Sequence, residues 1–284
     1  MAGLAGVAWA HGPWVMGGTI ALLAVFFLLR GRVRIEKGWA GFTLARFSGI
    51  ERFTHWLLAV SFIVLALTGL TARYGGMLLA PLLGTQGFAD VVRISKMLHG
   101  MLAFAFMAGL LLAFVLWVRH SLPHWRDVVW VLKGGGIIVP GWRPAAWKLN
   151  AGQKILFWLT MIGGVLLSLS GVALFFPGTG LFARTLAALG ALGLPLPPVL
   201  TPDQEMHYAA LWHAAVALVL LWVVCAHIII RTAGIQGAFA AMGSGRVDAN
   251  WARQHHSLWA ERELKRMDEA AEREAGKARA APAE

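Results

Sequence analysis

The stretch Trp212–Ile230, WHAAVALVLLWVVCAHIII, is apolar enough to cross a lipid bilayer, yet it contains His213 and His227. An ionisable side chain in the hydrocarbon core is costly without a partner, and such residues often mark functional sites. The two histidines are fourteen residues apart. At 100° per residue this spacing puts them on one face of an α-helix, roughly 21 Å apart along its axis. The stretch therefore predicts a membrane helix with one imidazole toward each surface of the bilayer.

The composition of the whole chain is that of a membrane protein. Of its 284 residues, 58% are hydrophobic and only 14% are charged, whereas soluble domains carry about 25% charged residues. Uncharged segments long enough to cross a bilayer core of roughly 30 Å are 3–29, 53–72, 97–118, 155–183 and 206–230. We expect an all-α integral membrane protein with five transmembrane helices.

The distribution of basic residues predicts the orientation of these helices. The connections 30–52 and 119–154 each contain six Lys or Arg, and the tail from Arg231 onward contains nine. The opposite side contains four, which are Arg73, Arg93, Lys96 and Arg184. Because basic loops stay in the cytoplasm, we expect a bacterial inner (plasma) membrane protein with a periplasmic N-terminus and a cytoplasmic C-terminus. Topology and anionic lipid then explain the net charge of +11, and no nucleic acid is needed.

The N-terminal segment has a second interpretation. Ala8–Ala10 resembles the cleavage site of a signal peptide, although neither a basic region nor an apolar core precedes it. If the natural start lies upstream, residues 1–10 are the end of a signal peptide. Residues 14–29 are expected to be a membrane anchor under both interpretations.

Four histidines lie within or at the ends of the apolar segments, and the alternating helix directions predict their depths. His99 and His213 are expected near the outer face, and His55 and His227 near the inner face. A lone histidine in a membrane helix is usually a hydrogen-bonded interior residue. Two pairs matched in depth instead suit two stacked hemes, each with two imidazole ligands and no open position for a substrate. A di-metal centre is not expected, because no carboxylate lies inside these helices.

Other residues give weaker signals. His207 is a rival outer ligand, but it would lie about 160° away from His227 around the helix. Surface or interfacial roles are expected for the loop histidines His120, His124, His255 and His256, and the single Cys225 excludes a disulfide framework and a Cys-ligated cluster. Glycines in the second, third and fourth helices suit helix packing or the close approach of a flat macrocycle, and they are Gly69, Gly100, Gly109, Gly163, Gly164 and Gly171.

Several stretches between about Arg46 and Glu261 resemble the cytochrome b (gamma) subunit of respiratory formate dehydrogenase. They are ERFTHWLLAVSFIVLALTGL at 51–70, LHGMLAF at 98–104, NAGQKILFW at 150–158, LWHAAVALVLL at 211–221 and ANWARQHHSLW at 249–259. The resemblance implies a four-helix di-heme cytochrome b bundle in residues 46–248. An additional N-terminal helix with its basic linker occupies 1–45, and a cytoplasmic tail occupies 249–284. The implied axial ligands of the two heme b irons are His55, His99, His213 and His227.

The same resemblance implies an electron path. An iron–sulfur beta subunit, accompanied by a molybdenum- or tungsten-containing alpha subunit, would supply electrons to the outer heme. The inner heme would pass them to menaquinone or ubiquinone. Asn150, Gly152 and Gln153 match the quinone-site loop of the family, and their amide and backbone donors suit a quinone carbonyl. Without the resemblance, Asn150 is an ordinary helix N-cap. The chain itself has no expected formate-oxidising site, and a higher oligomer of the complex is compatible with this interpretation.

Three alternatives stay open at this point. The first is the cytochrome b subunit of a hydrogenase or thiosulfate reductase, with the same hemes and a different partner. The second is a stand-alone transmembrane heme reductase, against which the apolar outer connections 73–96 and 176–205 argue, because they suit a partner or the membrane surface. The third is a heme-free transporter or assembly anchor, which a spectrum without a b-type α-band would favour.

Overall fold

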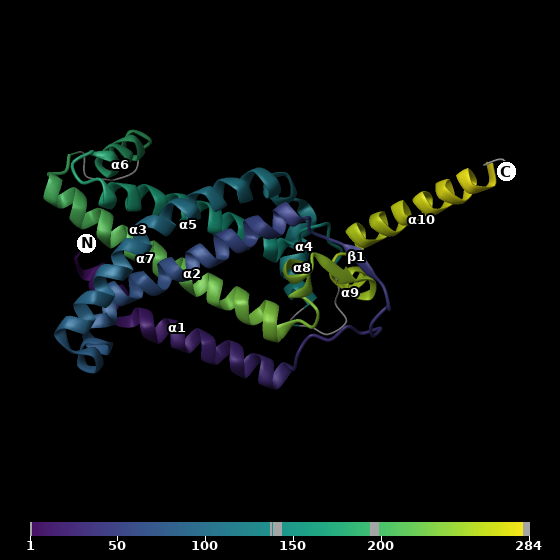
Figure 1. The fold of residues 1–284 in the computed structure, drawn as a ribbon, viewed down its shortest axis with the longest axis horizontal. Coiled ribbons are helices and arrows are strands. Elements are labelled where there is room, and N and C mark those ends of the chain that lie inside the picture. The colour runs from purple at the N-terminus through teal and green to yellow at the C-terminus, as the bar shows by residue number, and fades with distance from the viewer. Residues whose placement is uncertain (1, 137, 139–143, 194–198, 281–284) are drawn as a thin grey trace. The chain divides into compact units, whose positions relative to one another are not determined.

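The computed structural model describes residues 2–136, 138, 144–193 and 199–280, and most of them are helical (Figure 1). Contacts divide the chain into two compact units, which we describe separately. The bundle unit consists of Met1–Leu28, Phe53–Leu116 and Trp158–Ile228. The loop unit consists of Leu29–Arg52, Trp117–Phe157 and Ile229–Glu284.

Long apolar helices build the bundle unit. Within the described ranges, four helices are long and apolar enough to cross a membrane. They are α2 (Gly49–Leu78), α3 (Ala80–Ser121), α5 (Ala151–Phe175) and α7 (Pro202–Ile229). The helix α1 (Ala2–Arg30) is also long, and Trp222 Nε1 of α7 donates a hydrogen bond of 2.7 Å to its Thr19 Oγ1. The predicted all-α membrane bundle is confirmed for the four helices, while a membrane crossing by α1 stays a prediction.

The helix ends differ from the predicted ones for identifiable reasons. Both α2 and α3 extend past their uncharged segments, because three of the outer basic residues lie in helical turns and not in a loop. The helix α3 is kinked at Gly84, where φ is 69°, a left-handed conformation that favours glycine. By contrast, α5 ends at Phe175, well before the predicted end at Ala183, since Pro177 and Gly178 follow.

An apolar layer occupies the middle of the bundle unit. It consists of one side chain from each of α2, α3, α5 and α7, namely Phe62, Phe106, Leu167 and Leu220. Glycines allow the helices around this layer to approach closely. A Cβ at Gly109 of α3 would lie 3.3 Å from the backbone of Leu58 on α2, and one at Gly163 would lie 2.9 Å from the Leu220 side chain. Helix packing therefore accounts for these two glycines.

The helix α6 (Leu181–Ala191) precedes α7 and is attached to it by a carboxylate. Glu205 of α7 is buried, and its Oε1 accepts hydrogen bonds from the backbone N–H groups of Phe182 and Ala183, at 2.9 and 3.1 Å. These N–H groups belong to the first turn of α6, where a helix has donors without intrahelical acceptors. The outer connection before α7 is thus partly helical and tied to the bundle.

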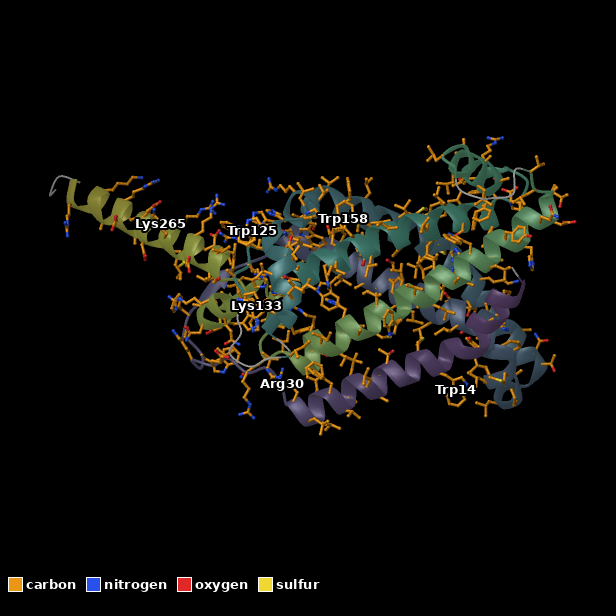
Figure 2. All side chains as sticks on the ribbon, turned by 180° about the vertical axis from the view of Figure 1, so that it is seen from behind. Trp14, Arg30, Trp125, Lys133, Trp158 and Lys265 are labelled. Carbon is orange, nitrogen blue, oxygen red and sulfur yellow. The ribbon has the colours of Figure 1, made fainter. Side chains whose placement is uncertain are left out.

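The loop unit contains several short helical elements, the longer helix α10 (Ser257–Ala280), and a small sheet that the sequence did not predict. The strand β1 (Thr43–Ala45) pairs antiparallel with β2 (Arg246–Asp248), and Leu44 lies opposite Val247. Its helical elements are α4 (Trp125–Leu132), the 3-10 turn η1 (Gly134–Gly136), the π-helical turn η2 (Ile230–Gly234), α8 (Ala240–Gly243), α9 (Ala249–His255) and α10 (Ser257–Ala280). The predicted cytoplasmic tail from residue 249 begins with α9, in which Ala249, Trp251 and Ala252 are buried. It continues as α10, which is exposed along most of its length and from which Lys265 projects (Figure 2).

Candidate functional site

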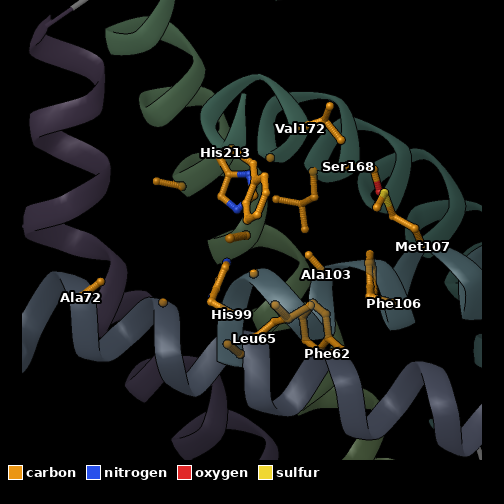
Figure 3. Close-up of a pocket in the computed structure, with 18 of the residues that line it drawn as sticks. Phe62, Leu65, Ala72, His99, Ala103, Phe106, Met107, Ser168, Val172 and His213 are labelled. Carbon is orange, nitrogen blue, oxygen red and sulfur yellow. The ribbon is translucent and has the colours of Figure 1, made fainter. Parts of the chain in front are cut away.

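A cavity of about 360 Å³ in the bundle unit separates His99 of α3 from His213 of α7 (Figure 3). The centroids of the two imidazole rings are 6.3 Å apart, and the ring planes are inclined by 57°. The remaining lining is mostly apolar and comes from α2, α3, α5 and α7. The structure thus brings together the two histidines that the topology assigns to the outer depth.

The separation of the two rings suits a single metal ion between them. A metal–imidazole nitrogen distance of about 2.0 Å, plus about 1.2 Å from nitrogen to ring centroid, gives roughly 6.4 Å between centroids of opposite ligands. The observed centroid distance is 6.3 Å. The separation therefore fits two imidazoles that share one metal ion, such as a heme iron, and the apolar lining suits a flat apolar macrocycle.

The second nitrogen of each ring is bound to a hydroxyl on a neighbouring helix. Thr68 Oγ1 of α2 lies 2.8 Å from His99 Nδ1, and Ser170 Oγ of α5 lies 3.0 Å from His213 Nδ1. Histidines that bind metals usually make a hydrogen bond through their other nitrogen, which fixes the ring. With Nδ1 engaged, Nε2 is the nitrogen available to a metal. Neither hydroxyl is distinguishable in the sequence from the other Ser and Thr residues of these helices.

The glycines of the long helices divide into two groups. Gly69 and Gly171 face the rings, since a Cβ would lie 3.7 Å from His99 Cε1 and 3.3 Å from His213 Cε1, respectively. Gly100 also lines the cavity, where a Cβ would meet the Phe175 ring at 2.9 Å. The others pack helices against each other, and they are Gly109, Gly163 and Gly164. Only the first group leaves room beside the histidines.

His55 of α2 and His227 of α7 both belong to the bundle unit and are half-buried. The His55 ring contacts the Trp56 ring edge to face, with centroids 5.2 Å apart. Leu220 of the apolar layer lies midway between His213 and His227 in the sequence. The layer therefore lies between the depths of the two predicted pairs. An inner heme held by His55 and His227 stays a prediction.

His207, the rival outer ligand, is exposed near the start of α7. Its ring contacts that of Tyr208, with centroids 5.8 Å apart. The cavity lining given by the described residues includes His213 and not His207. The histidine that lines the cavity is thus the one that helical periodicity favours, and its role as a ligand stays a prediction.

The predicted quinone-site residues lie at the start of α5 in the loop unit. The Asn150 N–H donates to Gln153 Oε1 at 3.2 Å, and the Gln153 N–H donates to Asn150 Oδ1 at 3.0 Å, which is a capping box. A Cβ at Gly152 would lie 2.9 Å from the Trp130 ring. These contacts support the ordinary helix-start interpretation. These two hydrogen bonds use only the side-chain oxygens of Asn150 and Gln153. The NH₂ groups of the same amides are separate donors, from which a quinone carbonyl could accept a hydrogen bond.

A second polar cluster in the loop unit corrects one expectation. His256 was expected at a surface, but it is fully buried. Its Nε2 accepts a hydrogen bond of 3.0 Å from Arg46 Nη2, and its Nδ1 donates to the Trp147 carbonyl at 2.8 Å. Burial and the adjacent Arg46 charge lower the pKa of His256 well below its usual value. The ring is therefore neutral and structural.

Arg46 itself is 3% exposed, and three aromatic rings surround its guanidinium. The guanidinium carbon lies 5.2 Å from the Phe47 ring centroid, 5.4 Å from that of Trp251 and 5.0 Å from that of Trp259. Cation–π contacts of this kind stabilise a desolvated cation. Arg46 and His256 together thus join the segment before α2 to the segment around α9.

Comparison with known proteins identifies the family. The family model of prokaryotic cytochrome b561 matches residues 46–245. The cytochrome b556(Fdn) subunit of the nitrate-inducible formate dehydrogenase of Escherichia coli K12 is 27% identical over 239 residues, covering 82% of this chain and 97% of that protein. The cytochrome b556(fdo) subunit of formate dehydrogenase from the same organism is 28% identical over 218 residues, covering 76% and 92%.

A second organism provides a similar relative. The cytochrome b556 subunit of formate dehydrogenase from Haemophilus influenzae is 27% identical over 220 residues, covering 75% of this chain and 80% of that protein. The residues that the family model matches include α2, α3, α5 and α7, of which α2, α3 and α7 carry the four paired histidines. The chain belongs to the prokaryotic cytochrome b561 family.

Proposed function

We propose that this multi-pass membrane protein is the cytochrome b subunit of a formate dehydrogenase, carrying electrons from an iron–sulfur subunit to quinone. One observation carries the proposal. His99 and His213 face each other at 6.3 Å across an apolar cavity, in a chain similar over most of its length to cytochrome b556 subunits of formate dehydrogenases. These relatives also favour formate dehydrogenase over a hydrogenase or thiosulfate reductase.

Two heme b groups are part of the proposal. His99 and His213 would hold the outer heme, and His55 and His227 the inner one. A heme with two imidazole ligands supplies one-electron transfer and has no open position for a substrate. The chain itself would supply the ligands, exclude water with an apolar lining, and fix the spacing between the two hemes. Since α7 provides one ligand at each depth, that spacing follows from fourteen residues of a single helix, or roughly 21 Å.

The quinone site and the partners complete the proposal. Asn150, Gly152 and Gln153 would offer amide and backbone donors to menaquinone or ubiquinone. An iron–sulfur beta subunit and a molybdenum- or tungsten-containing alpha subunit would oxidise formate and supply the electrons, since this chain contributes only the membrane path. The basic residues, 21 of 25 on one side, support a cytoplasmic C-terminus and a periplasmic N-terminus in the bacterial inner membrane.

The heme content of purified variants tests the ligand assignment. His213→Ala is expected to lose one of two b hemes and to stop formate-driven quinone reduction in the complex, because its heme would keep only one axial ligand. His227→Ala should lose the other heme. A pyridine hemochrome assay and a reduced-minus-oxidised spectrum measure both, and the subunits that co-purify with the unchanged chain identify the partner.

A matched control is available on the same helix. His207→Ala removes an exposed imidazole of α7 and is expected to keep both hemes and full activity. Two b hemes in purified His213→Ala would contradict the ligand assignment. Absence of any b-type α-band from the unchanged protein would contradict the proposed function altogether.

A further inference from the structure

We propose that Thr68 and Ser170 are positioning residues for the outer heme. Their hydroxyls fix the tautomer of His99 and His213 and lower the reduction potential of the iron that these rings bind. The inference rests on the proposed function in one respect, since it takes the two histidines as heme ligands. Neither residue attracts attention in the sequence, where each is one of several Ser or Thr residues in an apolar helix.

The other contacts of the Thr68 hydroxyl determine the direction of its bond to His99. Thr68 Oγ1 lies 2.8 Å from the Val64 carbonyl and 3.0 Å from the Leu65 carbonyl. A hydroxyl has one proton, and a carbonyl oxygen can only accept. The proton is therefore donated within α2, and the oxygen accepts from His99 Nδ1–H at 2.8 Å. The Nε2 lone pair is consequently free for the metal.

Ser170 of α5 repeats the arrangement on the other side of the cavity. Its Oγ lies 2.8 Å from the Leu166 carbonyl and 3.2 Å from the Leu167 carbonyl. Its proton is also committed to its own helix, so the oxygen accepts from His213 Nδ1–H at 3.0 Å. Both ligands therefore have the same tautomer, which is the one that axial ligation through Nε2 requires.

The repetition extends to the next residue. Thr68 lies in LTGL (67–70) and Ser170 in LSGV (169–172), so each hydroxyl is followed by a glycine. Gly69 and Gly171 face the same imidazoles that the hydroxyls bind, because a Cβ there would lie 3.7 and 3.3 Å from their Cε1 atoms. Each hydroxyl–glycine pair thus provides one acceptor and the space for the ring that donates to it.

Because Thr68 and Ser170 are buried, water cannot readily replace the hydrogen bonds that they make to His99 and His213. Thr68 is 8% exposed and Ser170 is 0% exposed, so water has little access to replace either hydroxyl. A hydrogen bond accepted from Nδ1–H increases the electron donation of the imidazole to its metal. Stronger donation favours ferric over ferrous iron, and the two hydroxyls therefore lower the potential of the outer heme.

Redox titration of purified Thr68→Val and Thr68→Ser separates the hydroxyl from the shape of the side chain. Valine keeps the branched shape without the acceptor, whereas serine keeps the acceptor. In Thr68→Val we expect both hemes to be retained and the reduced-to-oxidised ratio of the outer heme at fixed potential to rise about three- to tenfold, the size of one hydrogen bond. The low-spin ferric EPR signal of that heme should shift as well. The potential of the inner heme should not change in Thr68→Val. In Thr68→Ser, the potential and EPR signal of the outer heme should equal those of the unchanged protein.

Ser170→Ala and Ser170→Thr repeat the test at the second ligand. An unchanged potential and EPR signal in Thr68→Val and Ser170→Ala, with full heme content, would overturn the inference and leave the ligand assignment intact. If Thr68→Val loses the outer heme, Thr68→Ser tests the hydroxyl instead. An unchanged heme content and potential in Thr68→Ser would support the role of the hydroxyl, and loss of the heme in Thr68→Ser would overturn it. Failure of the proposed function has a different signature, which is two hemes in His213→Ala.

Discussion

Hydrogen-bond partners select the protonation state of histidine rings in both units of this chain. In the bundle unit, the oxygens of Thr68 and Ser170 lie at hydrogen-bond distance from Nδ1 of His99 and His213, and we infer that each ring carries its proton there. In the loop unit, His256 receives a bond from Arg46 at Nε2 and donates from Nδ1 to a carbonyl. An arginine can only donate, so a doubly protonated His256 could not keep this bond. The neutral ring is a condition of the folded loop unit.

Acidification should therefore destabilise the loop unit. Burial and Arg46 hold the folded-state pKa of His256 well below its usual value. The unfolded chain titrates at about 6.5 and binds more protons there, so this contribution to stability is complete above that pH and declines below it. The rate of trypsin cleavage after Arg253 in α9, divided by the rate for an unfolded control peptide at the same pH, should be higher at about pH 5.5 than at about pH 7.5, because this ratio reports local unfolding.

The control for this pH dependence is a neighbouring histidine. His256→Gln replaces the titrating ring with a neutral amide and should remove most of the difference between the two pH values. His255→Gln should preserve it, since His255 is only half-buried. An undiminished pH dependence in His256→Gln would assign the effect to another group.

The two amides at the start of α5 allow capping and quinone binding to be separated. Asn150→Asp and Gln153→Glu keep the side-chain oxygens that accept the capping hydrogen bonds, and both acids suit a helix N-terminus. They remove the NH₂ donors proposed for the quinone carbonyl. We expect unchanged heme content and a quinone reduction rate lowered about tenfold, since one hydrogen bond to substrate is worth about 1.4 kcal/mol.

Steady-state kinetics with a soluble quinol or quinone analogue measure this effect. Asn150→Ala provides the contrast, because it removes the cap as well as the donor and should also reduce thermal stability. Normal quinone reduction in both acidic variants would exclude these amides as the quinone donors.

At the residue scale, the direction of each helix and its periodicity were sufficient to predict which histidines lie close together. The pairing of His99 with His213 follows from helix order alone. The hydroxyl partners could not be found in this way, because a Ser or Thr in a membrane helix ordinarily bonds a carbonyl of its own helix. Their second bond depends on which helices are neighbours. The burial of His256 similarly depends on Arg46, which lies 210 residues earlier in the chain.

At the scale of helices, uncharged segments predicted the existence of the long helices better than their ends. The prediction placed Arg73 and Lys96 in a loop, but both are helical, so α2 and α3 are separated only at Leu79. A helix can continue past the hydrocarbon core because charged side chains there reach water. The end of α5 before Pro177 was readable from the Pro-Gly sequence, which the prediction overlooked.

The attachment of α6 gives a prediction at this scale. Glu205→Ala removes the acceptor for the N–H groups of Phe182 and Ala183 in the first turn of α6, and a buried donor left without a partner costs about 1–3 kcal/mol. We expect α6 to unfold locally and trypsin to cleave after Arg184 at least about fivefold faster, given that 1.4 kcal/mol corresponds to a factor of about ten. Heme content should stay unchanged.

Asp203→Asn is the matched control, since Asp203 is an exposed acid in the same first turn of α7. Its cleavage rate should equal that of the unchanged protein. Equal rates in Glu205→Ala would show that the packing of Phe182, and not the carboxylate, holds α6.

For the whole molecule, the sequence was informative about the bundle unit and nearly silent about the loop unit. Hydropathy reports the long helices because each satisfies its backbone hydrogen bonds by itself. The sheet of β1 and β2 has three residues per strand and pairs Thr43 with Asp248, so no local pattern reveals it. Contacts between distant segments hold the loop unit together, and a single sequence contains little information about them.

The uninterrupted course of α7 limits how the length of such a protein can change during evolution. One residue inserted between His213 and His227 would turn one imidazole by 100° and move it 1.5 Å along the axis. Insertions in the connections between helices have no comparable effect. Any descendant that keeps both histidines in use must keep the number of residues between them, while its loops are free to grow or shrink.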